Sequence, residues 1–165
     1  MTLIISETLL KRIHSHGEQA FPEEGAGLLL GVVENGARRV QRLLEFSNAR
    51  EDGARHNRYL LTPQDYLQGE LEAARLGLDV IGVFHSHPDH PNRPSEFDRE
   101  WAMPAWSYII TSVQTGRAVE SRSWLLSEDR SQFLEEAIQV VTENRSTDHT
   151  DLTEEDLGYK SVSSV

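Results

Sequence analysis

The sequence predicts an α/β (α+β) fold in which helices pack on a central β-sheet. Two continuous apolar runs, residues 27–33 and 80–84, are short and typical of buried strands. Two longer stretches, residues 6–20 and 63–76, carry the start and stop signals of helices. Helices and strands follow one another without strict alternation, which favours a sandwich of helices on a sheet.

The first helix is expected over residues 6–20. Ser6 is a candidate N-cap, and Glu7 lies in the first turn, where a negative charge is favourable. The Phe21-Pro22 pair then ends the helix. The apolar positions that give the helical spacing are Leu9, Leu10 and Ile13.

The next two strands are expected to form a hairpin. Residues 27–33, GLLLGVV, are too short for a typical helix and are broken by glycine, so they predict a buried strand. Asn35-Gly36 is a strong signal for a tight turn between two strands. Residues 40–46 follow this turn and predict the partner strand.

The middle of the chain is expected to lead through a loop into a second helix. Residues 47–58 are polar and loop-like, and residues 59–61 are a candidate short strand. Thr62 is the candidate cap of a helix over residues 63–76, whose first position is a proline. Gly77 ends this helix.

The second half of the chain is expected to contribute three strands and two helices. A final helix over residues 130–143 is predicted because several apolar residues share one helical face. These residues are Phe133, Leu134, Ala137, Ile138 and Val141. The other expected elements are a strand at 80–84, a loop at 85–94, a short helix at 95–102, and strands at 107–111 and 118–126.

Length and composition predict one domain with a short tail. A chain of 165 residues can bury a hydrophobic core without disulfides. The absence of cysteine excludes a disulfide, a thiolate zinc site and a cysteine nucleophile. The composition becomes polar and acidic from about residue 145, so we expect a folded domain over residues 1–145 and a flexible tail over residues 146–165.

The charge and the hydropathy restrict the expected partners and location. The formal net charge is −11, and such a surface repels nucleic acid and anionic membranes. The apolar stretch at the N-terminus is short and lacks a basic leading segment, unlike a signal peptide. No apolar run approaches the roughly 20 residues that span a bilayer. We therefore expect a cytoplasmic protein without a nucleic-acid or membrane partner.

Candidate chemistry is concentrated in residues 85–98, HSHPDHPNRPSEFD, directly after a buried strand. His85 and His87 are two residues apart, so along an extended chain both imidazoles project to the same side. Asp98 can return from the next helix as an oxygen ligand. Two histidines and one carboxylate leave one position of a tetrahedral zinc ion open for water, which is typical of catalytic sites. Zinc lowers the pKa of that water from 15.7 toward about 7.

A catalytic zinc site also needs a proton acceptor that is not a ligand. The sequence has no HExxH pattern, so Glu24, just before a buried strand, is the candidate general base. Simpler interpretations remain open. Ser95 and Asp98 also match a capping box that needs no metal, Glu24 alone would be a surface carboxylate, and His90 has no clear partner. The other histidines are interpreted as surface or loop residues: His14, His16, His56 and His149.

These residues resemble the signature of a known family, the JAMM metalloproteases, also called the MPN-plus domain. That signature is a distant glutamate, then His-Ser/Thr-His-Pro, then Ser-x-x-Asp after a short spacer. Here it is met by Glu24, by HSHP at residues 85–88 and by SEFD at residues 95–98. The segment PEEGAGLLLG also resembles the family's Pro-x-Glu segment, which favours Glu24 over Glu23.

The resemblance covers roughly residues 3–140 and implies both a fold and a site. The implied fold is a cytidine-deaminase-like sandwich, with a central mixed sheet flanked by helices. The implied ligands of Zn2+ are His85, His87 and Asp98. The resemblance also implies that Glu24 moves a proton from water to the leaving amine, and that Ser95 hydrogen-bonds the developing oxyanion.

The same resemblance implies a class of substrate. Compact prokaryotic members cleave a peptide or isopeptide bond after the C-terminal glycine of a ubiquitin-like or sulfur-carrier protein. Two alternatives stay open: a catalytically inactive scaffold of the same fold, and a zinc hydrolase of a small molecule. The intact signature argues against the scaffold, because such scaffolds usually lose metal ligands.

Overall fold

The computed structural model describes residues 1–47, 59 and 61–142 of the chain. The expected loop over residues 47–58 lies outside this part except for Ser47, and the tail over residues 146–165 lies wholly outside it. The domain boundary near residue 145 therefore stays a prediction. The elements, in chain order, are β1 (Thr2–Ser6), α1 (Glu7–Ala20), β2 (Ala26–Glu34), β3 (Ala37–Phe46), α2 (Pro63–Leu76), β4 (Asp79–Pro88), α3 (Glu96–Trp101), β5 (Ser107–Gln114), β6 (Arg117–Leu126) and β7 (Phe133–Val141).

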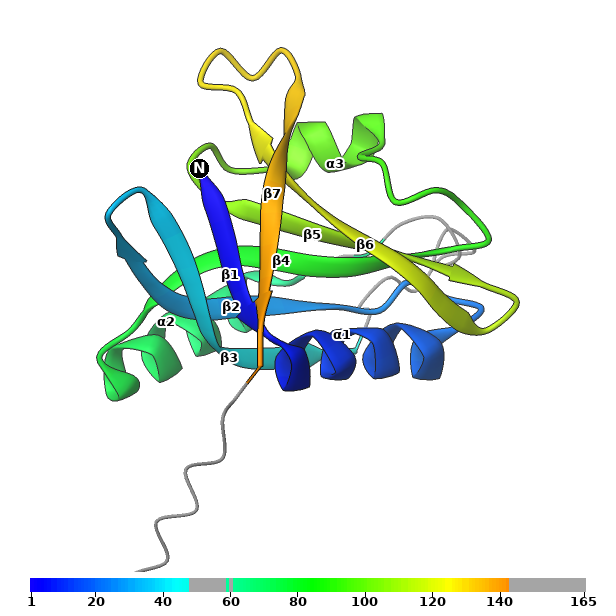
Figure 1. Cartoon of the computed structure of the whole chain (residues 1–165), viewed down its shortest axis with the longest axis horizontal. Helices are drawn as coiled ribbons and strands as arrows, with labels where there is room; N and C mark the ends of the chain where they lie inside the picture. The colour runs from blue at the N-terminus through cyan, green and yellow to red at the C-terminus, as the bar shows by residue number, and fades with distance from the viewer. Residues whose placement is uncertain (48–58, 60, 143–165) are drawn as a thin grey trace, which may run out of the picture.

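The strands form one mixed sheet that closes on itself (Figure 1), in the order β1-β3-β2-β4-β5-β6-β7. Strand β1 closes it, because β1 pairs in parallel with both β3 and β7. Strands β4 and β5 are also parallel, and the remaining neighbours are antiparallel. The predicted mixed sheet flanked by helices is confirmed, whereas its closure was not expected.

Helices α1 and α2 begin and end where the sequence predicts. Ser6 Oγ accepts a hydrogen bond from the backbone N–H of Leu9 at the start of α1. Thr62 and Asp65 form a complete capping box at the start of α2, and Gly77 ends it with a φ of 67°. Helix α1 packs on β4, β5 and β6, and α2 packs on β2 and β4. No helix in the described ranges is both long enough and apolar enough to cross a membrane.

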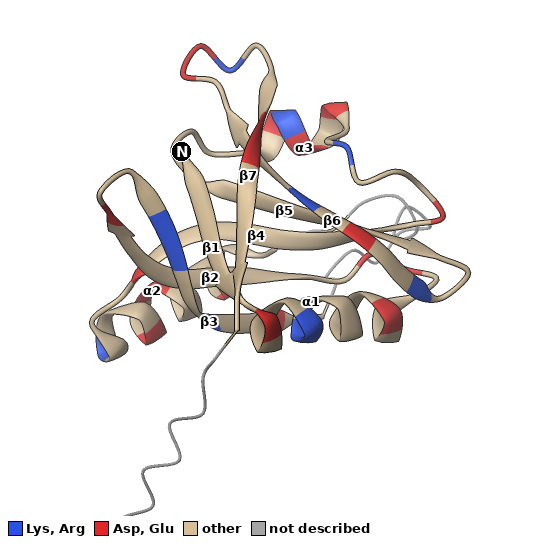
Figure 2. Cartoon of the chain, viewed as in Figure 1, with Lys and Arg blue, Asp and Glu red and all other residues tan. Residues whose placement is uncertain are grey.

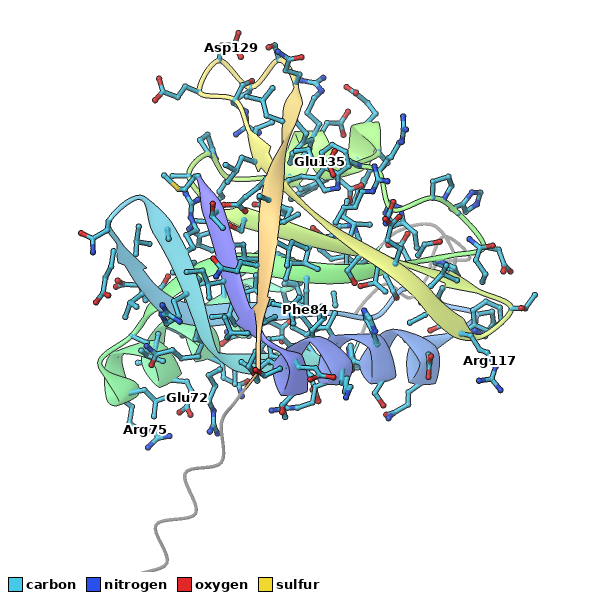
Figure 3. The ribbon with its side chains drawn as sticks, in the orientation of Figure 1. Glu72, Arg75, Phe84, Arg117, Asp129 and Glu135 are labelled. Carbon is cyan, nitrogen blue, oxygen red and sulfur yellow. The ribbon has the colours of Figure 1, made fainter. Side chains whose placement is uncertain are left out.

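Alternation along the central strands builds two cores, one on each face of the sheet. Leu28 of β2 is fully buried in the core beneath α2, which also contains Ala73. Leu29 is equally buried but belongs to the core beneath α1, which contains Ile13. Phe84 of β4 lies in this second core, and Figure 3 shows it in the middle of the molecule. The central strands are therefore covered on both faces.

The prediction of a helix over residues 130–143 is wrong, because this segment contains strand β7. Strand β7 pairs antiparallel with β6 and parallel with β1. Glu136 is buried, whereas the apolar side chains of Leu134 and Val140 are about half exposed. The apolar residues of this segment have helical spacing. Pairing with two distant strands overrides this local pattern.

Smaller expectations also differ from the structure. Residues 2–6 form β1, a strand that the sequence did not indicate. Strand β4 continues through Pro88, so the first residues of the expected loop at 85–94 belong to a strand. Tyr59 and Leu61 are not in a strand. The extension of β4 matters for the site, because it carries two candidate ligands on a rigid element.

Candidate metal centre

Two histidines lie near the end of β4, on the same face of the sheet. His85 is opposite Ala26 of β2, and Ser86 separates it from His87. Side chains two residues apart share a face, so both imidazoles lie on the face of Val83, in the core beneath α2. His85 is 1% exposed and His87 is 7% exposed. The two imidazoles therefore converge as the sequence predicts.

Asp98 brings a third ligand atom to the same point from α3. Its Oδ1 lies 3.2 Å from His85 Nε2, and its Oδ2 lies 3.6 Å from His87 Nε2. The two Nε2 atoms are 3.1 Å apart. Within the described ranges, this is the one group of three or more His, Asp or Glu side chains whose ligand atoms are close enough to share a metal ion.

These separations fit a tetrahedral zinc ion. Zinc binds imidazole nitrogen and carboxylate oxygen at about 2.0–2.1 Å, which places neighbouring ligand atoms of a tetrahedron about 3.3 Å apart. The three observed separations lie on either side of that value. Two imidazoles and one carboxylate also match the ligand preference of zinc and leave its fourth position to a non-protein ligand.

Neighbouring groups orient the two imidazoles. His87 Nδ1 lies 2.8 Å from the carbonyl oxygen of Pro91. Nδ1 must donate in this hydrogen bond, which leaves the lone pair of a neutral ring on Nε2. The ring of Tyr59 stacks on His85 with centroids 4.3 Å apart and an interplanar angle of 29°. His85 Nδ1 has no hydrogen-bond partner in the described part of the chain, so this stacking is a main constraint on its ring.

Burial and charge together set the protonation states. Burial lowers the pKa of His85, against the opposing effect of Asp98, and favours the neutral ring. Burial alone would raise the pKa of Asp98, but the adjacent imidazoles outweigh it and hold that pKa well below its usual value. Burial also raises the pKa of Tyr59 well above its usual value. A neutral imidazole and an ionised carboxylate are the forms that bind a metal ion.

Ser95 forms the capping box of α3 with Asp98. The backbone N–H of Ser95 donates to Asp98 Oδ2 at 2.6 Å, and Ser95 Oγ accepts from the backbone N–H of Asp98 at 3.1 Å. The Ser95 hydroxyl also donates to Oδ2 at 2.7 Å. The capping-box interpretation and the ligand interpretation are therefore compatible, because the cap holds the Asp98 carboxylate where His85 meets it.

Glu24 is buried, at 3% exposed, and is therefore not a surface carboxylate. The next residue, Gly25, is hydrogen-bonded to Ser86 twice: Gly25 N–H donates to Ser86 Oγ, and Ser86 N–H donates to the Gly25 carbonyl, each at 2.9 Å. These bonds attach the residue before β2 to β4, next to the last paired residues, Ala26 and His85. They hold the backbone directly after Glu24 against the segment of β4 that carries His85 and His87.

A cavity of about 390 Å³ opens beside the ligand cluster. Glu24, His87 and Ser95 all line it, so three of the five predicted site residues face one space. The side chain of His90, which the sequence left without a partner, is exposed and also lines the cavity. The full lining consists of Glu24, His87, His90, Pro91, Arg93 and Ser95.

Several contacts of this site were not predicted. Ser86 lies inside the signature, but no role was predicted for it, because its hydrogen bonds with Gly25 depend on the pairing of two strands that are distant in the sequence. Tyr59 has no local signal, because it reaches His85 from a distant segment. His14 and His16 are half-buried rather than on the surface. Their Nε2 atoms lie 3.0 Å from Ser121 Oγ and 3.2 Å from the Ala26 carbonyl, respectively.

The sequence matches a family described as prokaryotic homologs of the JAB domain over residues 6–127. It is 29% identical over 121 residues to a probable TtuB-protein conjugate cleaving protease of Thermus thermophilus, covering 72% of this chain and 75% of the relative. It is 37% identical over 68 residues to a desampylase of Pyrococcus furiosus, covering 41% of this chain and 46% of that relative.

Solved structures share the fold. A solution structure of a protein from Salinibacter ruber has a TM-score of 0.66 and 41% identity, covering 88% of this chain and 94% of that one. The crystal structure of a JAB1/MPN domain protein from Archaeoglobus fulgidus has a TM-score of 0.50 and 21% identity, covering 84% and 97%. The second likeness bears on the fold alone.

Proposed function

This chain belongs to the family of prokaryotic JAB (JAB/MPN) domains, and from that premise we propose that it is a zinc metallopeptidase. Its proposed substrate is a peptide or isopeptide bond after the C-terminal glycine of a ubiquitin-like or sulfur-carrier protein. One observation carries the proposal: the ligand atoms of His85, His87 and Asp98 converge beside a cavity that the buried Glu24 also lines.

The relatives support the class of reaction. One is named for cleaving protein conjugates of TtuB, and the other is named as a desampylase. The first comparison spans most of both chains, so it carries more weight than the second. Hydrolysis of a conjugate formed by a small carrier protein is the reaction that agrees best with the names of both relatives and with the residues of the site.

The ligand set implies what a metal would contribute. His85, His87 and Asp98 would hold the zinc ion, which when bound supplies Lewis-acid polarisation of the scissile carbonyl and of the attacking water. The Pro91 carbonyl and the Tyr59 ring keep the two imidazoles in the orientation that this binding requires. The cavity beside the ligands provides room for the scissile bond and for the residues that move protons.

Glu24 is the proposed general base and then the general acid. One carboxylate oxygen accepts a proton from the attacking water, and the same group then donates that proton to the leaving amine nitrogen. The hydrogen bonds between Gly25 and Ser86 hold the backbone next to Glu24, and its side chain lines the same cavity as His87.

The first of two proposed roles of Ser95 is to position the carboxylate of Asp98. Its hydroxyl hydrogen is already donated to Asp98 Oδ2. A hydrogen bond to the developing oxyanion, as the family resemblance implies, requires this hydroxyl to rotate away from the carboxylate. The two roles are compatible only if the Asp98 carboxylate keeps its other bonds, of which the Ser95 backbone N–H is one.

The test is hydrolysis of a carrier fusion. A small ubiquitin-like protein that ends in Gly-Gly and carries a short C-terminal extension is incubated with the zinc-loaded protein and followed by mass spectrometry. We expect cleavage after the second glycine, and we expect a chelator to abolish it. Zinc bound at about one ion per chain without cleavage of any carrier would instead favour a scaffold or a small-molecule hydrolase.

The role of Glu24 is tested with a neighbouring residue as control. Glu24→Gln should keep zinc and lower kcat by about 100-fold or more, because general acid–base catalysis contributes on the order of 10²–10⁴. Glu23→Gln changes the adjacent, half-exposed carboxylate and should stay within about twofold of wild type. Equal loss in both variants, or none in Glu24→Gln, would assign the base elsewhere.

A further inference from the structure

The segment that joins β4 to α3 has three consecutive backbone carbonyl groups that each meet a side-chain hydrogen-bond donor. The middle carbonyl belongs to Pro91 and lies 2.8 Å from Nδ1 of the candidate ligand His87. The carbonyls on either side of it belong to His90 and Asn92. Their donors are Ser112 Oγ of β5, at 2.7 Å, and the indole Nε1–H of Trp124 of β6, at 3.0 Å. The segment is therefore tied to the sheet on both sides of the carbonyl that meets His87.

Asn92 is the buried residue of this segment. Among residues 89–95, all of which the structure describes, it alone is buried, at 6% exposed. Its Nδ2 donates to the backbone carbonyl of Glu120 at 3.2 Å and to Glu120 Oε2 at 3.0 Å. Burial of an amide without such partners would be costly, so these bonds stabilise its position against the sheet. With the bond from Trp124, Asn92 makes three hydrogen bonds to β6.

The groups that hold the segment belong to a paired region of the sheet. Ser112 and Glu120 are opposite each other in the register of β5 and β6, and Trp124 lies four residues further along β6. Trp124 also packs against the core beneath α2, on the face of the sheet that carries the candidate ligands. The segment is therefore held by hydrogen-bonded strands and not by another loop.

We propose that Asn92 is a positioning residue for His87, and that it acts by holding the Pro91 carbonyl in place. An imidazole that binds a metal through Nε2 needs an acceptor at Nδ1 to fix its tautomer and its orientation. The carbonyl of Pro91 lies in one rigid plane with the backbone nitrogen and Cα of Asn92, because the peptide bond is planar. A fixed Asn92 therefore fixes the direction of that carbonyl. This role rests on the proposed function, because it requires His87 to be a zinc ligand.

Zinc affinity, measured by competition with a chromogenic chelator, tests this role without turnover. Asn92→Ala removes both bonds that the side chain donates and should weaken zinc binding by about tenfold or more. Trp124→Phe keeps an aromatic ring but loses the indole N–H, and should weaken zinc binding by about threefold. Trp106→Phe is the matched control and should stay within about twofold of wild type. Both tryptophans are half-buried and pack against the same core, but the bond to the segment comes from Trp124.

The Nδ1 proton of His87 gives a readout that a purely structural role would not change. In the zinc-loaded wild type, the hydrogen bond to the Pro91 carbonyl should protect this proton and give a slowly exchanging NMR signal. In Asn92→Ala the signal should be lost through exchange with solvent, whereas Trp106→Phe should retain it. If Asn92 served only to stabilise the fold, Asn92→Ala would unfold at a lower denaturant concentration, but the folded variant would keep the signal.

Reversal of one hydrogen bond provides a rescue experiment. Asn92→Asp keeps the size of the side chain but turns a donor into an acceptor that faces the carboxylate of Glu120, so it should weaken zinc binding at least as much as Asn92→Ala. Glu120→Gln alone should stay within about twofold of wild type, because its amide oxygen can still accept. In the double variant the glutamine amide can donate to the new carboxylate, and zinc affinity should recover by about threefold or more relative to Asn92→Asp.

Two outcomes would overturn the positioning role and leave the proposed function intact. One is zinc affinity within about twofold of wild type in both Asn92→Ala and Trp124→Phe. The other is weaker zinc binding with an unchanged His87 signal in every folded variant of Asn92. If Asn92→Ala does not fold, Trp124→Phe and the rescue pair decide. A wild type that binds no zinc would overturn the ligand assignment and the positioning role together.

Discussion

The side chains that meet at the candidate metal centre have little freedom to move apart. Each is buried, and each has a neighbour that orients it: the Pro91 carbonyl for His87, the ring of Tyr59 for His85, and the Ser95 cap for Asp98. Such supporting contacts typically change metal affinity by about 10–100-fold when they are removed. The site therefore depends on more residues than the ligands alone.

Loss of a ligand should release the metal. The wild type is expected to hold about one zinc ion per chain, and His87→Ala or Asp98→Ala should leave only a small fraction of that. His90→Ala is the control, because His90 lines the cavity without a place among the converging ligand atoms, and it should keep the zinc content of wild type. Elemental analysis after dialysis measures all three. Unchanged zinc in both ligand variants would reject the assignment.

At the residue scale, the sequence predicted the convergence of the candidate ligands better than the contacts that support them. His85 and His87 could be predicted because a spacing of two on an extended strand puts both imidazoles on one face. Asp98 was expected beside them because it follows at short range on the next helix and matches the Ser-x-x-Asp part of the family signature. Tyr59 and the Gly25–Ser86 pair could not be predicted, because these contacts join segments that lie far apart in the chain and carry no local pattern.

At the scale of elements, two helices offer a matched comparison. Helices α2 and α3 both begin with a complete capping box, Thr62 with Asp65 and Ser95 with Asp98. The first has no ligand in it, whereas the second holds the carboxylate of the candidate metal centre. A comparison of the two caps therefore separates the stability of a helix start from the orientation of a ligand.

Removal of the capping hydroxyl should destabilise the fold in both helices, but it should weaken zinc binding only in α3. Thr62→Ala and Ser95→Ala should each destabilise the fold by about 1 kcal/mol, as loss of an N-cap usually does. Ser95→Ala should in addition weaken zinc binding by about tenfold or more, because the carboxylate of Asp98 loses a hydrogen bond. Denaturant unfolding without zinc and competition with a chromogenic chelator measure the two effects. Equal zinc affinity in both variants would deny Ser95 a part in holding Asp98.

The incorrect prediction of a helix over residues 130–143 has a physical cause. The apolar residues of β7 recur at helical spacing and do not alternate as in a half-buried strand, so the local pattern favours a helix. The pairing of β7 with β6 and β1, which depends on the whole sheet, overrides that pattern. The helices α1 and α2 were predicted well because their caps are local signals.

At the scale of the whole molecule, a buried ion pair joins strands from different parts of the closed sheet. Arg38 of β3 lies 3.2 Å from Glu136 of β7, with both side chains nearly inaccessible. Ser107 and Ser123 donate hydroxyl hydrogen bonds to the same carboxylate at 2.7 and 2.8 Å. Figure 2 shows that acidic and basic residues are otherwise interspersed over the visible helices and strands.

Removal of one partner of this pair should be costly. Glu136→Ala leaves a buried guanidinium without its carboxylate and should lower the free energy of unfolding by about 3–5 kcal/mol. Glu135→Ala is the control from the same strand (Figure 3 labels Glu135), because Glu135 is exposed. Its carboxylate lies 3.9 Å from the guanidinium of Arg122. It should cost less than about 1 kcal/mol. Guanidinium unfolding compares them, and a similar cost in both variants would show that Arg38 does not depend on Glu136.

The arrangement of β1 has a consequence for how the protein is made. During translation, β1 leaves the ribosome before the other strands of this sheet, yet one of its two hydrogen-bonding neighbours is β7, the last of them to emerge. The ring therefore cannot close until nearly the whole described chain has been synthesised. Contacts between such distant segments carry a large loop-closure entropy and slow the search for the native state. All the candidate ligands of the metal centre are translated before β7. The nascent chain therefore contains them before the sheet can close.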